Sequence, residues 1–357
     1  MEENKQHKTA LPETEPIPSA QAPEALLDIR GLRVEYHTDE DVVYAVNGLD
    51  LTIGKGESLG LVGETGAGKT TTALSVLRLI ADPPGKIMGG EIWFEGEDML
   101  QAKPARLREI RGSKISVIFQ DPMTSLSPVY SVGDQIAEVI HQHEKCSKEE
   151  GRRKAGDMLE MVGIPRARYD EYPHQFSGGM KQRVVIAMSI ACSPELILAD
   201  EPTTALDVTI QAQVLELMNE LKEKLRTSLL LITHDLGVVA QVCDRVAIMY
   251  AGEIVESGTI AEVFDHPHHP YTIGLFGSIP SLDETAEKLK PIQGQMPDPT
   301  ELPEGCAFAP RCPYATGACR TRKPEMTGVG GTQMVRCLAH QGVFESPELM
   351  EEVRHGR

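Results

Sequence analysis

The sequence predicts an α/β fold, and two observations carry this prediction. Short apolar runs typical of buried strands alternate along the chain with segments whose apolar residues recur at helical spacing. One such run, residues 58–62, leads into a Gly-rich loop, and residues 71–80 after the loop carry their apolar side chains on one helical face. Strand, loop and helix in this order are the context that a phosphate-binding loop requires. The loop consists of Gly63, Glu64, Thr65, Gly66, Ala67, Gly68, Lys69 and Thr70.

The residue types of this loop suit the binding of a phosphate group. Its three glycines let the backbone wrap closely with its N–H groups turned inward, and the following helix adds its positive N-terminal end. We expect Lys69 to contact the β- and γ-phosphates of a nucleotide and the Thr70 hydroxyl to ligate Mg²⁺. The alternative is a Gly-rich turn that only joins a strand to a helix.

Composition limits the class of protein. The 357 residues are 41% hydrophobic and 25% charged, which fits one large domain with an extension, or two domains. The net charge of -18 argues against non-specific nucleic-acid binding, because no basic surface is available for phosphate backbones. Residues 1–25, rich in Pro, Glu and Gln, are expected to form a disordered tail. No later run reaches the roughly 18 apolar residues that span a bilayer.

Residues 26–53 precede the loop and contain four β-rich runs separated by polar or Gly-containing turns, which predicts an antiparallel sheet. Tyr36 ends one of these runs, and its aromatic face could stack on a nucleotide base. Tyr44 is the competing candidate, and a half-buried strand tyrosine is the alternative for either residue.

Further strands are expected at residues 91–94 and 115–119, with a basic helical segment at 106–111 between them. Gln120 follows the second of these strands and offers an amide oxygen to a metal ion or a water molecule. Residues 131–172 then have the spacing of apolar residues that predicts a helical insert.

The insert ends at Ser177, Gly178 and Gly179, which precede a helix expected to run through residues 184–191. The N-terminus of this helix and the Ser177 hydroxyl form a second candidate anion site. An ordinary helix cap is the alternative.

Acidic residues and a histidine follow two later strands. A buried strand at residues 196–199 delivers Asp200 and Glu201 at its C-terminal end. Asp200 can hold Mg²⁺ through water, and Glu201 can orient or polarise an attacking water. The strand at residues 229–233 ends at His234, where strand ends border the ligand crevice of an open α/β sheet.

In this order, the motifs resemble the nucleotide-binding subunit of ATP-binding cassette (ABC) transporters, over about residues 26–264. The resemblance implies a P-loop NTPase core with an antiparallel β subdomain and a helical subdomain that carries the signature motif. It implies that Lys69, Thr71 and the loop amides bind ATP. The remaining implied roles are Mg²⁺ binding by Thr70, Gln120 and Asp200, general base catalysis by Glu201, and γ-phosphate sensing by His234.

Two cassettes pair head to tail in this family, so Ser177, Gly178 and Gly179 would contact ATP held by the partner, with Asp207 in the D-loop between them. One copy of each motif implies a second ATPase subunit, expected to be a paralogue in a heterodimer. Met180 stands where the family signature usually has glutamine, a departure that leaves the Ser-Gly-Gly site intact.

Residues outside the shared motifs indicate a subfamily. Residues 120–128 and 269–272, with the Cys-bearing extension that follows, resemble oligopeptide, dipeptide and nickel importers, above all their "D" type ATPase subunit. The resemblance implies a peripheral ATPase on the cytoplasmic face of the membrane. Its implied partners are two membrane permease subunits and, indirectly, an extracytoplasmic substrate-binding protein.

Three alternatives stay open at this point. The chain could serve a nickel or other solute importer of the same family. It could be a soluble cassette protein that acts on ribosomes or DNA repair complexes, although these usually carry two cassettes or long coiled-coil inserts. It could also close on ATP without turnover, against which the presence of Glu201 argues. The expected domains are residues 26–264 for the cassette and 265–345 for the extension, with a tail at 346–357.

Four of the seven cysteines, Cys306, Cys312, Cys319 and Cys337, lie in a Pro- and Gly-rich stretch of the extension with little apolar periodicity. Such a segment needs a cross-link or a metal to stay folded. Four thiolates can bind a [4Fe–4S] cluster or Zn²⁺, whereas disulfides are disfavoured in a reducing cytoplasm. Zinc sites favour close Cys pairs, but five and six residues separate the first three cysteines. The spacing and the resemblance both favour the cluster, and four cysteines packed as small hydrophobes are the remaining alternative.

Overall fold

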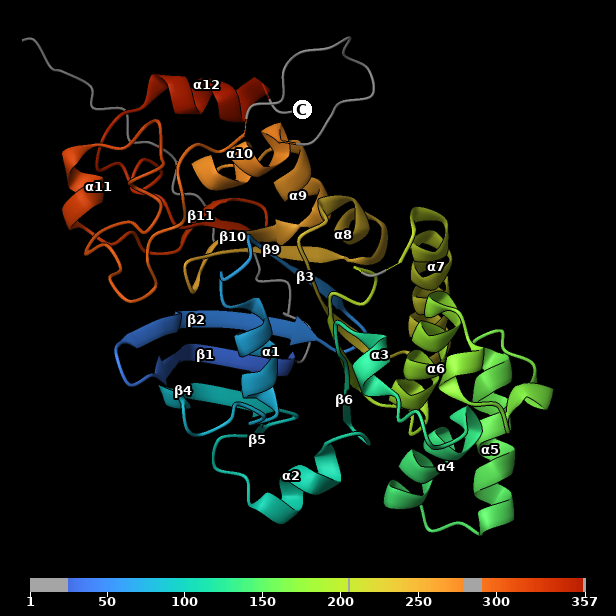
Figure 1. Cartoon of the computed structure of the whole chain (residues 1–357). Helices are drawn as coiled ribbons and strands as arrows, with labels where there is room; N and C mark the ends of the chain where they lie inside the picture. The colour runs from blue at the N-terminus through green and yellow to red at the C-terminus, as the bar shows by residue number, and fades with distance from the viewer. Residues whose placement is uncertain (1–24, 205, 279–290, 356–357) are drawn as a thin grey trace, which may run out of the picture.

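The computed structural model describes residues 25–204, 206–278 and 291–355. Two sheets form the centre of the molecule, with a helical subdomain at one end and the C-terminal region at the other (Figure 1). Residues 1–24, where a disordered tail was expected, lie outside the described residues. Residue 25, assigned to that tail, instead begins the first strand.

The smaller sheet is antiparallel, as the sequence predicts, with the strand order β2-β1-β4-β5. Its strands are β1 Ala25–His37, β2 Val42–Gly54, β4 Gly85–Phe94 and β5 Glu97–Asp98. The four runs expected within residues 26–53 merge into the two long strands β1 and β2. Register shifts in the β1–β2 pairing absorb the polar and glycine residues that suggested turns.

The larger sheet has eight strands in the order β11-β12-β10-β9-β3-β8-β7-β6. Strands β6, β7, β8, β3 and β9 are mutually parallel, and β10, β12 and β11 extend the sheet in antiparallel pairing. The bounds are β3 Ser58–Val62, β6 Ile115–Ile118, β7 Leu196–Asp200, β8 Ser228–Thr233, β9 Arg245–Tyr250, β10 Glu253–Thr259, β11 Thr327–Gly330 and β12 Gln333–Val335.

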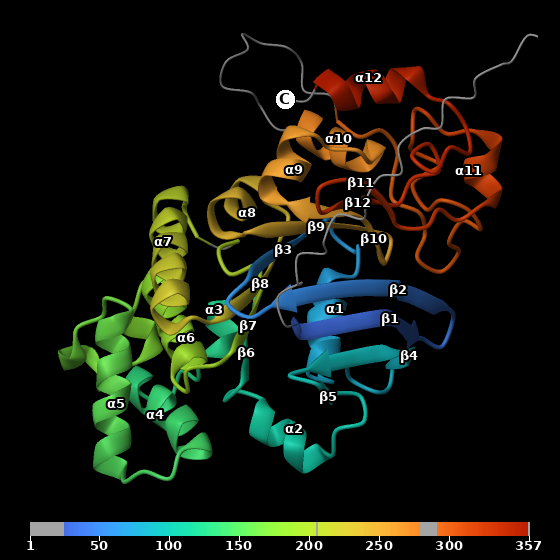
Figure 2. The same ribbon diagram turned by 180° about the vertical axis from the view of Figure 1, so that it is seen from behind.

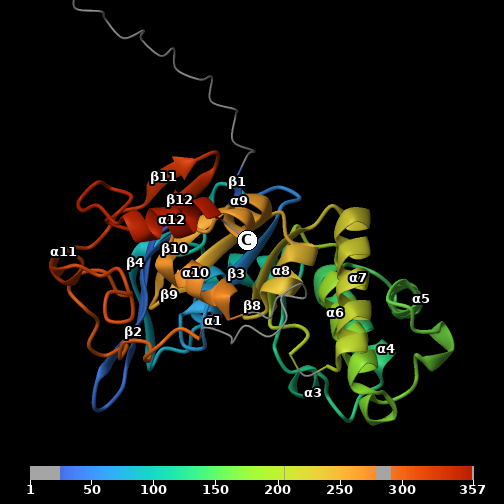
Figure 3. The same cartoon turned by 90° about the horizontal axis from the view of Figure 1, so that it is seen from above.

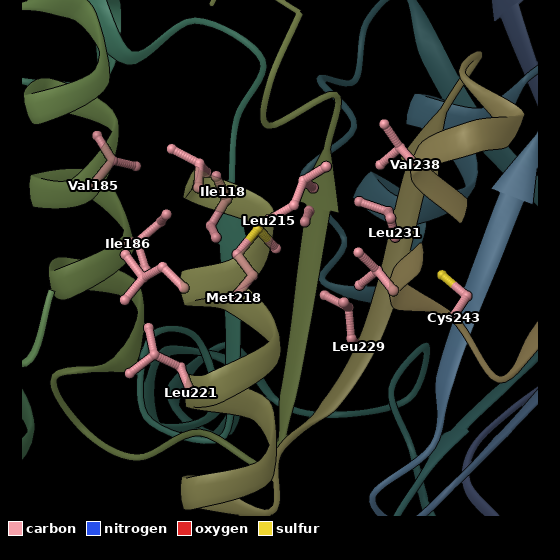
Figure 4. Packing of buried hydrophobic residues seen from close by; sticks show 14 of the residues in the cluster. Ile118, Val185, Ile186, Leu215, Met218, Leu221, Leu229, Leu231, Val238 and Cys243 are labelled. Atoms are coloured by element: carbon pink, nitrogen blue, oxygen red, sulfur yellow. The ribbon is translucent and has the colours of Figure 1, made fainter. Parts of the chain in front are cut away.

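Both faces of the large sheet are covered, which explains the continuous apolar runs of its strands. In β8, Leu230 and Ile232 pack toward the small sheet, whereas Leu229 and Leu231 pack into the core on the helical side. Figure 4 shows this second core, where side chains of α6, α7 and β8 point toward one another. The carboxyl ends of the parallel strands are therefore held at fixed positions along one edge of the sheet.

Helices surround the sheets. The first, α1, begins at Lys69 but ends at Val76, earlier than the apolar pattern through Ile80 predicts. Leu77 and Ile80 still pack against the core, so the pattern continues in the non-helical chain. The helices are α1 Lys69–Val76, α2 Pro104–Ile110, α3 Pro122–Ser125, α4 Val132–His143, α5 Lys148–Met161, α6 Gly178–Ile190, α7 Val208–Leu225, α8 Leu236–Val242, α9 Ile260–Asp265, α10 Pro270–Gly277, α11 Gly317–Thr321 and α12 Pro347–His355.

The predicted helical insert forms α4 and α5, which lie away from the sheets on the far side of α6 (Figure 2). Ser131 and Ser147 cap these two helices through their hydroxyl groups. The expectation of a buried strand through Phe119 was wrong at its last residue. Strand β6 ends at Ile118, and Phe119 is exposed.

The C-terminal region lies at the end opposite the insert (Figure 3). Its strand β12 pairs with β10, so this region continues the large sheet. The tail expected at residues 346–357 is wrong for residues 347–355, which form α12. Leu349 and Val353 of this helix are buried against the rest of the region, and this burial keeps it folded. Within the described ranges, no helix is both long and apolar enough to cross a membrane.

Candidate active site

The Gly-rich loop joins β3 to α1 as the sequence predicts. Gly66 and Gly68 adopt φ values of 85° and 102°, a region that other residues rarely occupy. A Cβ atom on Gly63 would collide with the Met249 carbonyl, and one on Gly68 with the Ala45 carbonyl. Thr65 and Gly66 are exposed at the apex, and no side chain caps the amides at the start of α1. The loop thus presents backbone N–H groups to an anion.

Lys69 lies buried beneath this loop. Its Nζ donates hydrogen bonds to the carbonyl oxygens of Gly63, at 2.7 Å, and Glu64, at 3.0 Å. Burial lowers the pKa of Lys69, although the nearby carboxylates of Glu201, Asp200 and Glu64 act in the opposite direction. The ammonium group is therefore held at the loop by acceptors that a phosphate can replace.

Thr70 and Asp200 meet at the base of the site. The Thr70 side chain lies close enough to the Asp200 carboxylate to lower its pKa, and Asp200 is buried at the end of β7. Burial and the negative charge of Glu201 raise the pKa of Asp200, against the lowering effect of Thr70 and Lys69. A buried carboxylate beside a hydroxyl is an oxygen donor set that suits Mg²⁺.

Two sequence-predicted residues, Gln120 and His234, converge on Glu201. Gln120 Nε2 donates to Glu201 Oε2 at 3.0 Å, and His234 Nδ1 lies 3.1 Å from Glu201 Oε1. The Thr204 hydroxyl also donates to Oε2, at 2.8 Å. Partial burial acts to raise the pKa of Glu201, but the hydrogen bonds from His234 and Thr204 outweigh it and lower the pKa. The carboxylate is thus kept ionised, as a proton acceptor must be.

The backbone also fixes Glu201. Its φ of 47° is unusual for a residue other than glycine. Its N–H donates to the carbonyl oxygen of Ile232 in β8 at 2.8 Å. This bond links the ends of β7 and β8, and it explains how residues from separate strand ends come together.

Tyr36 lies beside the first turn of α1. Its hydroxyl is 3.2 Å from the Thr71 hydroxyl, and its ring is only partly buried. Tyr44, the competing candidate, is exposed and its N–H donates to the Pro299 carbonyl. Of the two tyrosines, Tyr36 is the one that the structure brings to the helix following the loop.

The structure places Ser177, Gly178 and Gly179 on the helical subdomain, at the start of α6. The Ser177 hydroxyl caps the helix by accepting from the Met180 N–H, and Ser177 and Gly178 are exposed. Asp207 caps α7 by accepting from the Ile210 N–H at 3.0 Å. Ser177, Gly178 and Asp207 are exposed, whereas Gly179 is buried.

The four cysteines of the C-terminal region line one enclosed cavity together with Phe308, Leu338 and other apolar residues. Burial raises the pKa of Cys306 to about 11 and that of Cys312 to about 12. Within the described ranges, no three or more His, Cys, Asp or Glu side chains are placed closely enough to hold a metal as they stand. The thiols share one cavity, but a metal would have to draw them together and displace their protons.

Comparisons with known proteins bear on this arrangement. Residues 46–204 match the family model described as "ABC transporter", and residues 255–319 match "Oligopeptide/dipeptide transporter, C-terminal region". The oligopeptide transport ATP-binding protein AppD of Bacillus subtilis (strain 168) is 48% identical over 88% of this chain and 97% of its own length. The chain belongs to the ATP-binding subunits of ABC transporters. This ABC protein is accordingly an ATPase.

Other relatives and solved structures agree with this assignment. The ABC protein is 50% identical to the oligopeptide transport ATP-binding protein OppD of the same organism, over 91% of this chain and 93% of that one. The post-hydrolysis dimer of the ATP-binding cassette MJ0796 with ADP and Pi has a TM-score of 0.59 and 27% identity. It covers 66% of this chain and 98% of the cassette.

One part of the site escaped prediction from the sequence. Arg311 and Tyr271 of the C-terminal region contact Glu64 of the loop, through the Glu64 carboxylate and the Glu64 N–H respectively. Tyr271 lies within residues 269–272, which indicate only the subfamily, and Arg311 belongs to no motif of the sequence. No local pattern joins residues that are 247 positions apart.

Proposed function

We propose that the chain is the ATP-hydrolysing subunit that powers import of dipeptides or oligopeptides across a membrane. Support comes from the similarity to peptide-transport ATP-binding proteins, which extends through the C-terminal region as well as the cassette. The proposed units are residues 26–264 for the cassette and 265–345 for the extension. The observation that carries ATP hydrolysis is the convergence of Gln120, Thr204 and His234 on Glu201.

In the proposed mechanism, the phosphates of ATP are bound by the loop from Gly63 to Thr70, together with Thr71 of α1. The Tyr36 ring stacks on the nucleotide base of ATP. Glu201 accepts the proton of the attacking water, which its ionised state allows. Gln120 and His234 hold the Glu201 carboxylate in place, and His234 also contacts the γ-phosphate. Thr70, Asp200 and Gln120 would hold Mg²⁺, which neutralises charge on the phosphates when bound.

The active form is a dimer of cassettes, in our proposal with a paralogous subunit. The exposed Ser177 and Gly178 at the N-terminus of α6, with Gly179, would contact ATP on the partner's loop, and Asp207 would lie at the interface between them. Because MJ0796 is described as a dimer, a similar pairing suits this chain.

A groove lined by residues of β6, α3, α4 and α6 is the proposed contact with a membrane permease subunit. The groove has a volume of about 670 Å³. Its walls include the apolar side chains of Leu79, Phe119 and Val185, and both Leu79 and Phe119 are exposed. Phe119 directly precedes Gln120, which donates a hydrogen bond to Glu201. A permease segment in the groove would therefore contact the residue next to Gln120. Two permeases docked in this way hold the ATPase pair at the cytoplasmic face of the membrane, and an extracytoplasmic binding protein supplies the substrate.

For the cysteine cavity we propose a [4Fe–4S] cluster with a structural role, bound by Cys306, Cys312, Cys319 and Cys337. Support comes from the four thiols that line one cavity and from their spacing, whereas Zn²⁺ is the alternative. Protein purified without oxygen should be brown, with about four iron and four sulfide ions per chain. If the protein contained stoichiometric zinc and no iron, the site would be a Cys₄ zinc site and not an iron–sulfur cluster. If the protein were free of metal and its four thiols could be titrated, both proposals would be excluded.

The proposed transport function is tested with the ATPase, its partner subunit and the permeases reconstituted in lipid vesicles. Binding protein loaded with a dipeptide or an oligopeptide should stimulate ATP hydrolysis and drive uptake of labelled peptide. Stimulation and uptake with Ni²⁺ but with no peptide would contradict the peptide assignment and support the nickel importer instead.

A further inference from the structure

The C-terminal region makes an ion pair with the phosphate-binding loop. Arg311 donates to both carboxylate oxygens of Glu64, from Nη1 at 2.8 Å and from Nη2 at 3.1 Å. The Arg311 side chain is only 5% exposed, and that of Glu64 is 30% exposed. A two-pronged pair of this kind fixes both the charge and the orientation of the carboxylate.

Arg311 is itself held in place. It donates to the carbonyl oxygen of Gln293 at 3.0 Å and to the Tyr250 hydroxyl at 3.4 Å. Tyr250 packs edge-on against Phe308, with ring centroids 5.2 Å apart. The Arg311 guanidinium is therefore held in its position beside Glu64 by the Gln293 carbonyl and by Tyr250, which packs on Phe308.

A second contact reaches the backbone of the same loop residue. The Glu64 N–H donates to the hydroxyl of Tyr271, at 3.0 Å, and Tyr271 is fully buried at the start of α10. The Gly63 carbonyl, which belongs to the same peptide group as the Glu64 N–H, accepts from Lys69 Nζ at 2.7 Å. The C-terminal region thus fixes the peptide group to which the phosphate-binding lysine is bonded.

The charge of Glu64 matters because the loop receives a polyanion. An uncompensated carboxylate in the loop would repel the triphosphate, and Arg311 cancels this charge. We propose that Arg311 and Tyr271 are positioning residues for the nucleotide site. They neutralise and orient Glu64, so that the C-terminal region sets the affinity of the loop for ATP.

Equilibrium titration of the full chain with mant-ATP and Mg²⁺ tests this proposal. Arg311→Met should weaken binding by at least about tenfold, equal to about 1.4 kcal/mol, because Glu64 is left unpaired beside the phosphates. Adding Glu64→Gln to this variant should restore affinity to within about threefold of wild type. The control is Arg322→Met, which removes an exposed arginine of the same region and should change nothing.

Unchanged affinity in Arg311→Met, or a double variant as weak as Arg311→Met, would overturn the role of the charge. Restoration by Glu64→Gln separates this role from a merely structural one, because the second change does not replace the lost Arg311 contacts. Should Arg311→Met fail to fold, Tyr271→Phe supplies the test. It removes only the acceptor of the Glu64 N–H and should weaken mant-ATP binding about threefold or more, while the variant still folds. Unchanged affinity in that variant would contradict the proposal.

Discussion

The Gln120 side chain donates a hydrogen bond of 3.0 Å to the carboxylate of Glu201, although 81 residues separate the two. Gln120 follows the exposed Phe119 of the groove, whereas Glu201 follows the buried end of β7. The Gln120 side chain is therefore the direct link between the proposed permease contact and Glu201, the proposed general base.

This connection predicts the effect of Gln120→Ala. Loss of one hydrogen bond of about 0.5–1.5 kcal/mol should lower permease-stimulated ATP hydrolysis by about twofold to tenfold. Rates measured with and without the permeases give the degree of stimulation. Gln213→Ala, at an exposed position on α7, is the matched control and should keep full stimulation. Full stimulation in Gln120→Ala would contradict the connection.

Lys69→Ala should weaken nucleotide binding. The variant removes the buried ammonium group and its charge-assisted bonds, which are worth about 1.5–3 kcal/mol each, so affinity should fall by about tenfold or more. Titration with mant-ATP measures the change. Lys86→Ala, which removes an exposed lysine from β4, should bind as the wild type does. If the two variants bound mant-ATP with equal affinity, the assignment of Lys69 to the nucleotide site would be wrong.

The purified subunit alone should hydrolyse ATP slowly. Its Ser177 site faces solvent, and we propose that it needs the phosphate loop of another chain. The specific rate should rise with subunit concentration and rise further when the partner subunit is added. Full activity of a demonstrated monomer, independent of concentration, would rule out this requirement.

Stability in acid should depend on Glu262 of α9. Although partial burial acts to raise it, hydrogen bonds from Thr332 and Thr259 lower the pKa of Glu262 to about 2. A carboxyl group with a lowered folded-state pKa stabilises the fold above its unfolded pKa of about 4.5, and this contribution is lost as the pH falls toward about 2.

Glu262→Gln should therefore lower the free energy of unfolding by about 1–2 kcal/mol at pH 6, a value reduced for the partial exposure of the group. Near pH 2 the difference from wild type should vanish. Urea unfolding of both proteins at several pH values measures the difference. A gap that stays constant between pH 6 and pH 2.5 would show that the charge of Glu262 is not its cause.

Local patterns predicted the strand and the loop of the strand–loop–helix unit and the buried strands β7 and β8, whereas α1 ends at Val76 rather than at Ile80. Residues 58–62 match β3 because a strand covered on both faces needs a continuous apolar run. The merging of runs into β1 and β2 was missed, because register shifts let polar and glycine residues stay within a strand. Helix α12 was missed because its burial depends on partners in distant segments.

The site was predictable to the extent that its residues follow strand ends. Asp200, Glu201 and His234 each come directly after or at the end of a buried strand, and parallel strands bring such ends together. Arg311 follows no pattern of this kind. Its contact with Glu64 depends on the packing of the C-terminal region against the loop, which only the folded structure shows.

The most direct test of the account is ATP hydrolysis by the assembled transporter with Glu201→Gln. The amide keeps the shape and hydrogen-bonding capacity of the carboxylate but cannot accept the proton of water. Binding of mant-ATP should stay within about threefold of wild type, whereas steady-state hydrolysis should fall by at least about a hundredfold. Glu216→Gln, an exposed position on α7, controls for the loss of one negative charge. Wild-type turnover in Glu201→Gln would contradict the assignment of Glu201 as the general base.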